Sequence, residues 1–406
     1  MSPDRAIVEL GSLGLHRGGH LLVKHCLQQV PVEGAVLVRG SDPELAVHLR
    51  GWCRSQGHRL GEMEGEGRAD GLSITVFRGA SQVGRWKGAE PTGHADPRSP
   101  DAVHEAPPAR WGLAARGATI EAGAPEFDFA LDNKVEVWAD EARRLYLQAS
   151  AAQWDPETAI DWTRPCDLPD EVEDAVVQVM TYLIENETAA LLVPARFLAQ
   201  VHPHFKEVLQ LLAVQMADEA RHIEVFTRRA LLHRDEPGLS TAGGQASLKT
   251  LIDEPDFALA SFLLSVLGEG TFLSLLLFLE VHAPDEITRQ IMKLAARDEA
   301  RHVAFGVAHL KRHIAQDPGE RDRLAQAVHR RHAALRDTAG LNEEVFDSLI
   351  LLAAGSFDHE AIARGFDAVS ELQREMDQSR QKRLLSLGFE PEDAAELSSL
   401  HTRNFM

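Results

Sequence analysis

Hydrophobic residues follow two different patterns along the chain. In the first eighty residues, short apolar runs alternate with amphipathic stretches, which predicts strands at 7–10, 34–38 and 72–77 and helices at 19–29 and 42–56. From about residue 126, apolar residues recur every three or four positions, as in helices that bury one face. We therefore expect a multidomain α+β protein with a small α/β domain over 1–80, a linker over 81–125 and an all-α helical bundle over 126–406.

The bundle pattern predicts eight helices, at 133–150, 169–201, 204–233, 256–281, 285–315, 319–338, 342–357 and 359–384. Pro194 is expected to kink the second of them. Residues 235–255 are rich in Gly, Ser and Thr and are expected to connect two helical hairpins from one end of the bundle to the other. The segment 81–125 is rich in Gly, Pro, Ala and charge, a composition that buries too little apolar surface to order itself.

One five-residue string occurs twice inside the predicted bundle. It reads Asp218-Glu219-Ala220-Arg221-His222 and again Asp298-Glu299-Ala300-Arg301-His302. Residues three apart on a helix share a face, so each copy presents one carboxylate and one imidazole together. Two such helices supply half of a dinuclear metal site, in which two other helices each add a glutamate.

The position of the hairpin turns locates the two missing glutamates. If Pro203 marks the turn of the first hairpin, Glu219 lies 16 residues after it and Glu187 lies 16 residues before it. Glu187 is therefore expected to lie level with Glu219. Glu185 is the alternative, although two residues along a helix turn a side chain away by about 200°.

The second hairpin gives the matching residue. Glu299 lies 15 residues after Pro284, and Glu269 lies 15 residues before it, with no other acid within ten residues on either side. The candidate metal ligands and catalytic residues are therefore Glu187, Glu219, His222, Glu269, Glu299 and His302.

A single Glu-x-x-His on a helix is common and usually marks a solvated face. Here the string is duplicated, and each copy has an acid one hairpin arm upstream, within strongly apolar helices. A carboxylate buried there is unfavourable without a partner, and four converging carboxylates repel one another unless cations neutralise them. The duplication therefore favours a dinuclear metal site over a surface ion pair.

Charge and cysteine content limit the partners and the cellular location that we expect for the protein. The formal charge of −20 argues against nucleic acid or an anionic membrane as a partner. Cys26, Cys53 and Cys166 show no paired spacing, which fits a reducing compartment. The N-terminus lacks an apolar signal segment, and the run 275–279 is too short to span a bilayer. We expect a cytoplasmic protein.

The N-terminal domain resembles the small bacterial sulfur-carrier proteins of the TusA type. The resemblance lies in the segments "VLVRGSDPE" and "GWCRSQGHRL", and covers about a fifth of the chain. Those carriers begin their first helix with Cys-Pro-x-Pro, whereas the matching stretch here is Arg17-Gly18-Gly19-His20. Without that cysteine no persulfide forms there, so a docking or stabilising role is expected.

The duplicated string, with Glu187-Thr188 and Gly268-Glu269-Gly270 upstream, resembles the carboxylate-bridged di-iron oxygenases of the ferritin-like superfamily. The resemblance implies that Glu187, Glu219 and His222 hold one iron and that Glu269, Glu299 and His302 hold the other, with some carboxylates bridging. It also implies that two aspartates fix the histidine rings, each able to reach the other hairpin, and that two arginines brace them: Asp218, Asp298, Arg221 and Arg301.

The expected function is that of a non-haem di-iron oxygenase or oxidase, with O2 as co-substrate and a small organic molecule as substrate. Carboxylates with two imidazoles suit two iron ions, and a manganese and iron pair is the alternative. Electrons are expected from an external donor, because no flavin or iron–sulfur motif is present. An iron-handling or peroxide-scavenging protein of the ferritin or rubrerythrin kind is the alternative. The oligomeric state stays open, a homodimer among the options.

Overall fold

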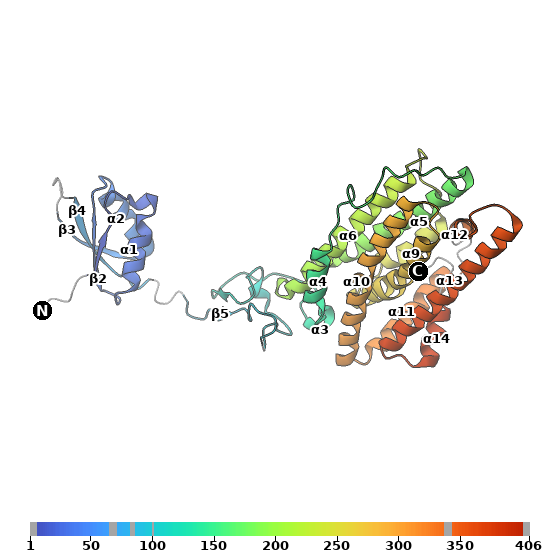
Figure 1. Cartoon of the computed structure of the whole chain (residues 1–406). Helices are drawn as coiled ribbons and strands as arrows, with labels where there is room; N and C mark the ends of the chain where they lie inside the picture. The colour runs from blue at the N-terminus through green and yellow to red at the C-terminus, as the bar shows by residue number, and fades with distance from the viewer. Residues whose placement is uncertain (1–5, 65–70, 82–85, 100, 337–342, 401–406) are drawn as a thin grey trace. The chain divides into compact units, whose positions relative to one another are not determined.

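The computed structural model describes residues 6–64, 71–81, 86–99, 101–336 and 343–400. The chain divides into two compact units, one of Met1–Thr92 with Gly117–Pro125 and one of Gly93–Arg116 with Glu126–Met406 (Figure 1). Residues 93–116, which the sequence analysis assigned to the linker, thus belong to the same unit as the helical bundle. The boundaries at 80 and 126 stay predictions.

The first unit is built on a four-stranded sheet with strand order β1-β2-β4-β3. β1 pairs with β2 in parallel, whereas β2 and β3 both pair with β4 in antiparallel fashion. The elements are β1 (Ala6–Glu9), η1 (Leu15–Arg17), α1 (Gly19–Gln28), β2 (Ala35–Gly40), α2 (Leu45–Gln56), β3 (Arg59–Glu64) and β4 (Leu72–Phe77), followed by the short strands β5 (Glu90–Pro91) and β6 (Thr119–Ile120). The three strands and two helices expected here are present, and the resemblance to sulfur carriers stays a prediction.

Strand β3 was not predicted from the sequence. It lies at the edge of the sheet, and its residues are exposed or only partly buried. An edge strand with one free side needs no continuous apolar face, so the hydrophobic pattern gave no signal for it.

The second unit is helical. After η2 (Ala109–Trp111) its elements are α3 (Lys134–Val137), α4 (Ala142–Ala151), α5 (Asp170–Leu198), η3 (Pro203–Phe205), α6 (Lys206–Ala230), α7 (Ala242–Ile252), α8 (Phe257–Ser261), η4 (Phe262–Glu269), α9 (Gly270–Val281), α10 (Glu286–Gln316), α11 (Glu320–Leu335), α12 (Glu343–Ala354), α13 (His359–Ser386) and α14 (Pro391–Ser399). α5 packs along α6, and η4 and α9 pack along α10, which makes the two expected hairpins (Figure 1).

Three segments of the helical unit have detail that the sequence did not reveal. The helix expected at 133–150 is broken, because Trp138 is extended and its indole N–H donates to Asp140 Oδ1 at 2.9 Å. The connection 235–255 contains helix α7, whose N-terminus is capped by Thr241. The helix expected at 256–281 includes a π-helical segment, η4, which ends at Glu269. A π-turn adds one residue to a turn, and periodicity does not reveal it.

The ligand-bearing elements cross two hydrophobic cores. One core contains Phe197, Leu212, Phe262 and Phe305, and the other contains residues such as Leu183, Phe226, Phe272 and Ile291. Along each of α5, α6, η4–α9 and α10, the acids and histidines of the duplicated hairpins lie where the helix passes from one core to the other. The bundle therefore has a polar layer between two apolar layers.

The segment 93–116 is held against the start of α6 by a buried ion pair. Arg116 donates to both carboxylate oxygens of Glu207, at 2.5 and 2.8 Å, and to the carbonyl oxygen of His204 at 3.0 Å. Both charged side chains are almost fully buried. A bidentate pair of this kind fixes the geometry of a segment whose apolar content is too low to fix it.

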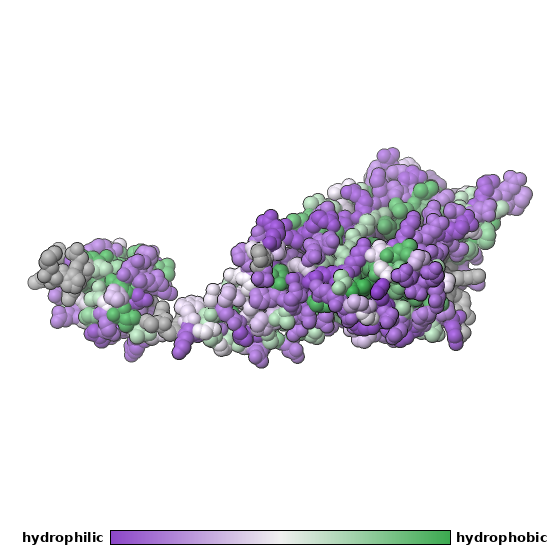
Figure 2. All heavy atoms as spheres, turned by 90° about the horizontal axis from the view of Figure 1, so that it is seen from below, coloured by the Kyte–Doolittle hydropathy of each residue, from purple (hydrophilic) through white to green (hydrophobic). Residues whose placement is uncertain are grey.

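One helical run in the described part of the chain, Phe257–Val281, is long and apolar enough by length and composition to cross a membrane. The apolar run 275–279, judged too short to span a bilayer, lies near the C-terminal end of this helical run. In the structure, 72% of the most apolar 18-residue stretch of this run is buried inside the protein, as in the core helix of a bundle. Figure 2 shows hydrophilic side chains over most of the visible face of the helical unit. The cytoplasmic location stays a prediction.

A buried arginine joins the two hairpins. Arg229 of α6 is fully buried and donates to Glu173 of α5 at 2.6 and 2.9 Å. It also donates to Asp285, which caps α10, and to Thr288, at 2.9 and 2.8 Å. Removing the cation would leave two carboxylates buried without a counter-charge.

We therefore expect Arg229→Met to lower the free energy of unfolding by about 3–5 kcal/mol, measured by urea unfolding followed by circular dichroism. The matched control is Arg228→Met, because Arg228 pairs with Glu157, whose side chain is 70% exposed. The control should lose about 1 kcal/mol or less. Equal losses in the two variants would contradict the role assigned to Arg229.

Candidate metal centre

Four elements bring the six candidate ligands into the polar layer of the bundle. α5 supplies one glutamate, the end of η4 supplies another, and α6 and α10 each supply a glutamate and a histidine. All six side chains are buried, with 0–3% of their surface exposed: Glu187, Glu219, His222, Glu269, Glu299 and His302. The sequence analysis had left Glu185 as an alternative; it is partly exposed and lies outside this layer, whereas Glu187 lies within it.

The six residues form two overlapping groups, each able to hold one metal ion. One group contains Glu187, Glu219, His222 and Glu299, and the other contains Glu219, Glu269, Glu299 and His302. Within each group one ligand atom per residue lies within 4.8 Å of the others. Because Glu219 and Glu299 belong to both groups, they are the carboxylates placed to bridge two ions.

The separations between donor atoms suit metal coordination. His222 Nδ1 lies 3.4 Å from Glu187 Oε1, 3.2 Å from Glu219 Oε2 and 3.3 Å from Glu299 Oε1. His302 Nδ1 lies 3.1 Å from Glu219 Oε1 and 3.4 Å from Glu299 Oε2. Adjacent nitrogen and oxygen ligands at about 2.1 Å from one ion are about 3 Å apart, so both groups have the spacing of a filled coordination sphere.

The same donor atoms lack hydrogen bonds. Among the described residues, buried atoms without a hydrogen-bond partner include both oxygens of Glu219, both oxygens of Glu299 and one oxygen of Glu187. One oxygen of Glu269 and Nδ1 of each histidine are also buried without a hydrogen-bond partner. A buried polar atom is unfavourable unless it is paired. The donor set therefore fits two cations, which would satisfy these atoms together.

The pKa shifts have the direction expected of a site built for cations. Burial raises the pKa of Glu187 well above its usual value, and the charge of Glu299 adds to the rise. Burial and Glu299 raise the pKa of Glu269 in the same way. Burial alone would lower the pKa of His222, but the facing carboxylates, Glu187 first, raise it well above its usual value. Without metal, protons take the place of the cations.

The histidine rings are oriented from the opposite hairpin. Nε2 of His222, on α6, lies 3.3 Å from Asp298 Oδ2, on α10. Nε2 of His302, on α10, lies 3.2 Å from Asp218 Oδ2, on α6. An aspartate that accepts the Nε2 proton leaves Nδ1 free to face the metal and raises the basicity of the ring. Each copy of the duplicated string thus supplies the aspartate that orients the histidine of the other copy.

Two arginines tie these aspartates together. Arg221 pairs with Asp218 on its own helix, and its Nη2 lies 3.4 Å from Asp298 Oδ2 on the other hairpin. Arg301 pairs with Asp298 on its own helix and lies 3.4 Å from Asp218. The guanidinium groups therefore offset the negative charge of the two aspartates behind the histidines.

Sequence reasoning missed three residues of the centre. Trp154 donates its indole N–H to Asp298 at 2.8 Å, and Gln153 donates to Asp218 at 2.9 Å. These residues follow helix α4 and lie between the helices predicted at 133–150 and 169–201. Gln215 donates to Glu269 Oε1 at 3.0 Å. It lies one helical turn before a candidate ligand, on the same face of α6, and this spacing could have identified it.

Comparison with known proteins adds little to this geometry. No protein-family model matches the sequence, and no curated protein matches it. Among solved structures, an R2-like ligand-binding oxidase with aerobically reconstituted Mn/Fe cofactor is 18% identical, with a TM-score of 0.41, covering 66% of this chain and 91% of that one. An R2-like ligand-binding oxidase from Sulfolobus acidocaldarius is 15% identical, with a TM-score of 0.41, covering 62% of this chain and 92% of that one. Both TM-scores are low, so the function is inferred from the residues of the site and not from these structures.

The overlap of the two groups predicts unequal effects of single substitutions. We expect two metal ions per wild-type chain, measured by elemental analysis after anaerobic loading with Fe(II). Glu187→Ala should keep about one ion, because Glu187 belongs to one group, whereas Glu299→Ala should weaken both. Glu224→Ala, an exposed position on α6, is the control and should keep two. Full metal content in Glu299→Ala would contradict the assignment.

The crossed aspartates predict a selective effect. Asp298→Asn should weaken the ion held by His222, and Asp218→Asn the ion held by His302, each by about 10–100-fold in a metal titration. Asp298→Asn should therefore add little to Glu187→Ala, which removes the same ion. It should add its full effect to Glu269→Ala, which removes the other. The reverse pattern would show that each aspartate acts on its own hairpin.

Proposed function

We propose that the helical unit is a dinuclear metal oxidoreductase that uses O2 to oxidise a small organic substrate. The observation that supports the proposal most is the buried layer of four glutamates and two histidines, whose facing atoms have no hydrogen-bond partner within the described part of the chain. A cluster on the protein surface that binds metal adventitiously would not need buried ligands.

The ligand set favours iron, or a manganese and iron pair. Carboxylate oxygens dominate both groups and each has one imidazole, a mixture that suits these metals better than copper. When bound, such a pair supplies the electrons that reduce O2. Insertion of one oxygen atom with reduction of the other to water takes four electrons, two from the substrate and two from the pair, so we also propose a separate electron donor that re-reduces the pair.

The side chains divide the work around that pair. Glu219 and Glu299 are placed to hold two ions side by side, and the terminal carboxylates complete each sphere. Asp218 and Asp298 keep the Nε2 protons of the two histidines in place, so that both Nδ1 atoms stay available. The apolar layers on either side exclude water, which protects a reactive oxidant from side reactions.

Trp154 contacts both His222 and Asp298 at the centre. The ring of Trp154 lies nearly parallel to that of His222, with 6.4 Å between centroids, while its N–H is bound to Asp298. A tryptophan whose two ends are both engaged is fixed in position. Trp154 is therefore a positioning residue for the His222 side of the centre.

Oxygen reactivity separates the proposed function from iron storage. Protein loaded anaerobically with Fe(II) should, on exposure to O2, show a transient absorption that forms and decays once per pair of ions. Glu299→Ala should lack it, and Glu224→Ala should retain it. Oxidation that proceeds without a transient and yields only aggregated ferric oxide would favour an iron-handling protein and contradict the proposal.

A further inference from the structure

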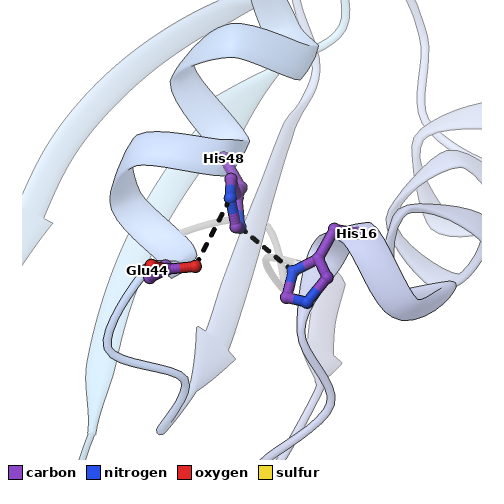
Figure 3. Close-up of side chains that lie close together, drawn as sticks. All are labelled: His16, Glu44 and His48. Atoms are coloured by element: carbon purple, nitrogen blue, oxygen red, sulfur yellow. Dashed lines mark hydrogen bonds and ion pairs between the residues drawn. The ribbon is translucent and has the colours of Figure 1, made fainter.

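A second group of metal-binding side chains lies in the small α/β unit. His16 belongs to the short helix η1, and Glu44 and His48 lie on the first turns of α2. Figure 3 shows the His48 ring between the other two side chains, with one ring nitrogen toward Glu44 and the other toward His16. None of these residues takes part in the dinuclear centre.

The two histidines present their nitrogens at the spacing of metal ligands. Nδ1 of His16 lies 3.2 Å from Nδ1 of His48, and the ring planes make an angle of 65°. Two imidazole nitrogens at about 2.1 Å from one tetrahedral ion are about 3.4 Å apart. An ion can therefore enter between them with a shift of a few tenths of an ångström.

Glu44 orients the shared histidine from its other side. Its carboxylate Oε2 lies 3.6 Å from Nε2 of His48, four residues later on the same helix face. A carboxylate that attracts the Nε2 proton directs the lone pair of Nδ1 toward His16. A carboxylate that moved to hydrogen-bond distance on metal binding would raise the basicity of the ligand, as in carboxylate–histidine–metal sites.

A buried carboxylate oxygen provides a second, independent observation. Oδ2 of Asp42 is buried and has no hydrogen-bond partner among the described residues, whereas Oδ1 accepts from the Glu44 backbone at 3.1 Å. A Cβ placed on Gly14 would lie 2.7 Å from Asp42 Oδ2 and 3.0 Å from His16 Nδ1. Asp42 Oδ2 and His16 Nδ1 thus both lie beside Gly14, where the missing side chain leaves space next to them.

We propose that this group binds a divalent transition-metal cation of the zinc type. His16 Nδ1 and His48 Nδ1 are its nitrogen ligands, and Glu44, the carboxylate of the same group, lies beside His48. Imidazole donors suit Zn²⁺, and a tetrahedral ion would complete its coordination with water. Without an ion, the two Nδ1 atoms lie within hydrogen-bond distance of each other.

The test compares zinc binding in the full chain and in single variants. Each protein is first loaded anaerobically with Fe(II), and zinc and iron per chain are then measured after equilibrium dialysis against buffered Zn²⁺. We expect one zinc equivalent in wild type that His16→Ala and His48→Ala both lose. His25→Ala removes an exposed histidine of α1 outside the group and should keep it. Glu44→Gln should weaken zinc binding by about 10–100-fold.

Iron content serves as the folding and independence control. It should be the same in all the histidine variants, because the dinuclear centre uses other residues. The proposal is overturned if wild type and His48→Ala bind equal zinc, or if His25→Ala loses as much zinc as His48→Ala. Loss of iron from the wild type with an equal extra gain of zinc would show exchange at the dinuclear centre, and the difference in zinc between wild type and His48→Ala would still test the second site.

Discussion

Repulsion between buried carboxylates is the constraint that explains the helical unit. At an effective dielectric constant of 20, two like charges 4 Å apart repel by roughly 4 kcal/mol, and the polar layer brings four glutamates together. Burial and the neighbouring carboxylates raise the pKa values of Glu187 and Glu269, which favours protonation of these two side chains when no cation is bound. Cations relieve the repulsion more completely, because they also satisfy the histidine Nδ1 atoms. The two hairpins are therefore arranged around charge that must be neutralised.

The rest of the bundle keeps that layer in register. Apolar cores above and below fix the height of each ligand-bearing helix, and the crossed contacts His222–Asp298 and His302–Asp218 couple the hairpins at the centre. Arg229 couples them again through Glu173 and Asp285. A helix that slid by one turn would break both sets of contacts and bury unpaired charge.

Much of the metal centre could be predicted from the sequence, because the duplicated motif names four of the ligands and the lengths of the two hairpins locate the other two. The motif and the hairpin lengths together identified Glu187 and Glu269 as partners of the two Asp-Glu-Ala-Arg-His strings, and the structure brings all six side chains together. The π-turn before Glu269 could not be predicted, since it changes the helix by one residue without changing its composition. Trp154 was missed for another reason: a contact from a turn to Asp298, 144 residues away, leaves no periodic trace.

The most direct test of the central claim is anomalous X-ray scattering at the iron edge from crystals grown anaerobically with Fe(II). The account predicts two peaks about 3.5–4 Å apart. Glu219 and Glu299 should contact both peaks, and each histidine should contact one through Nδ1. No peak in the polar layer of the bundle, or a single ion bound through His Nε2 atoms, would contradict it.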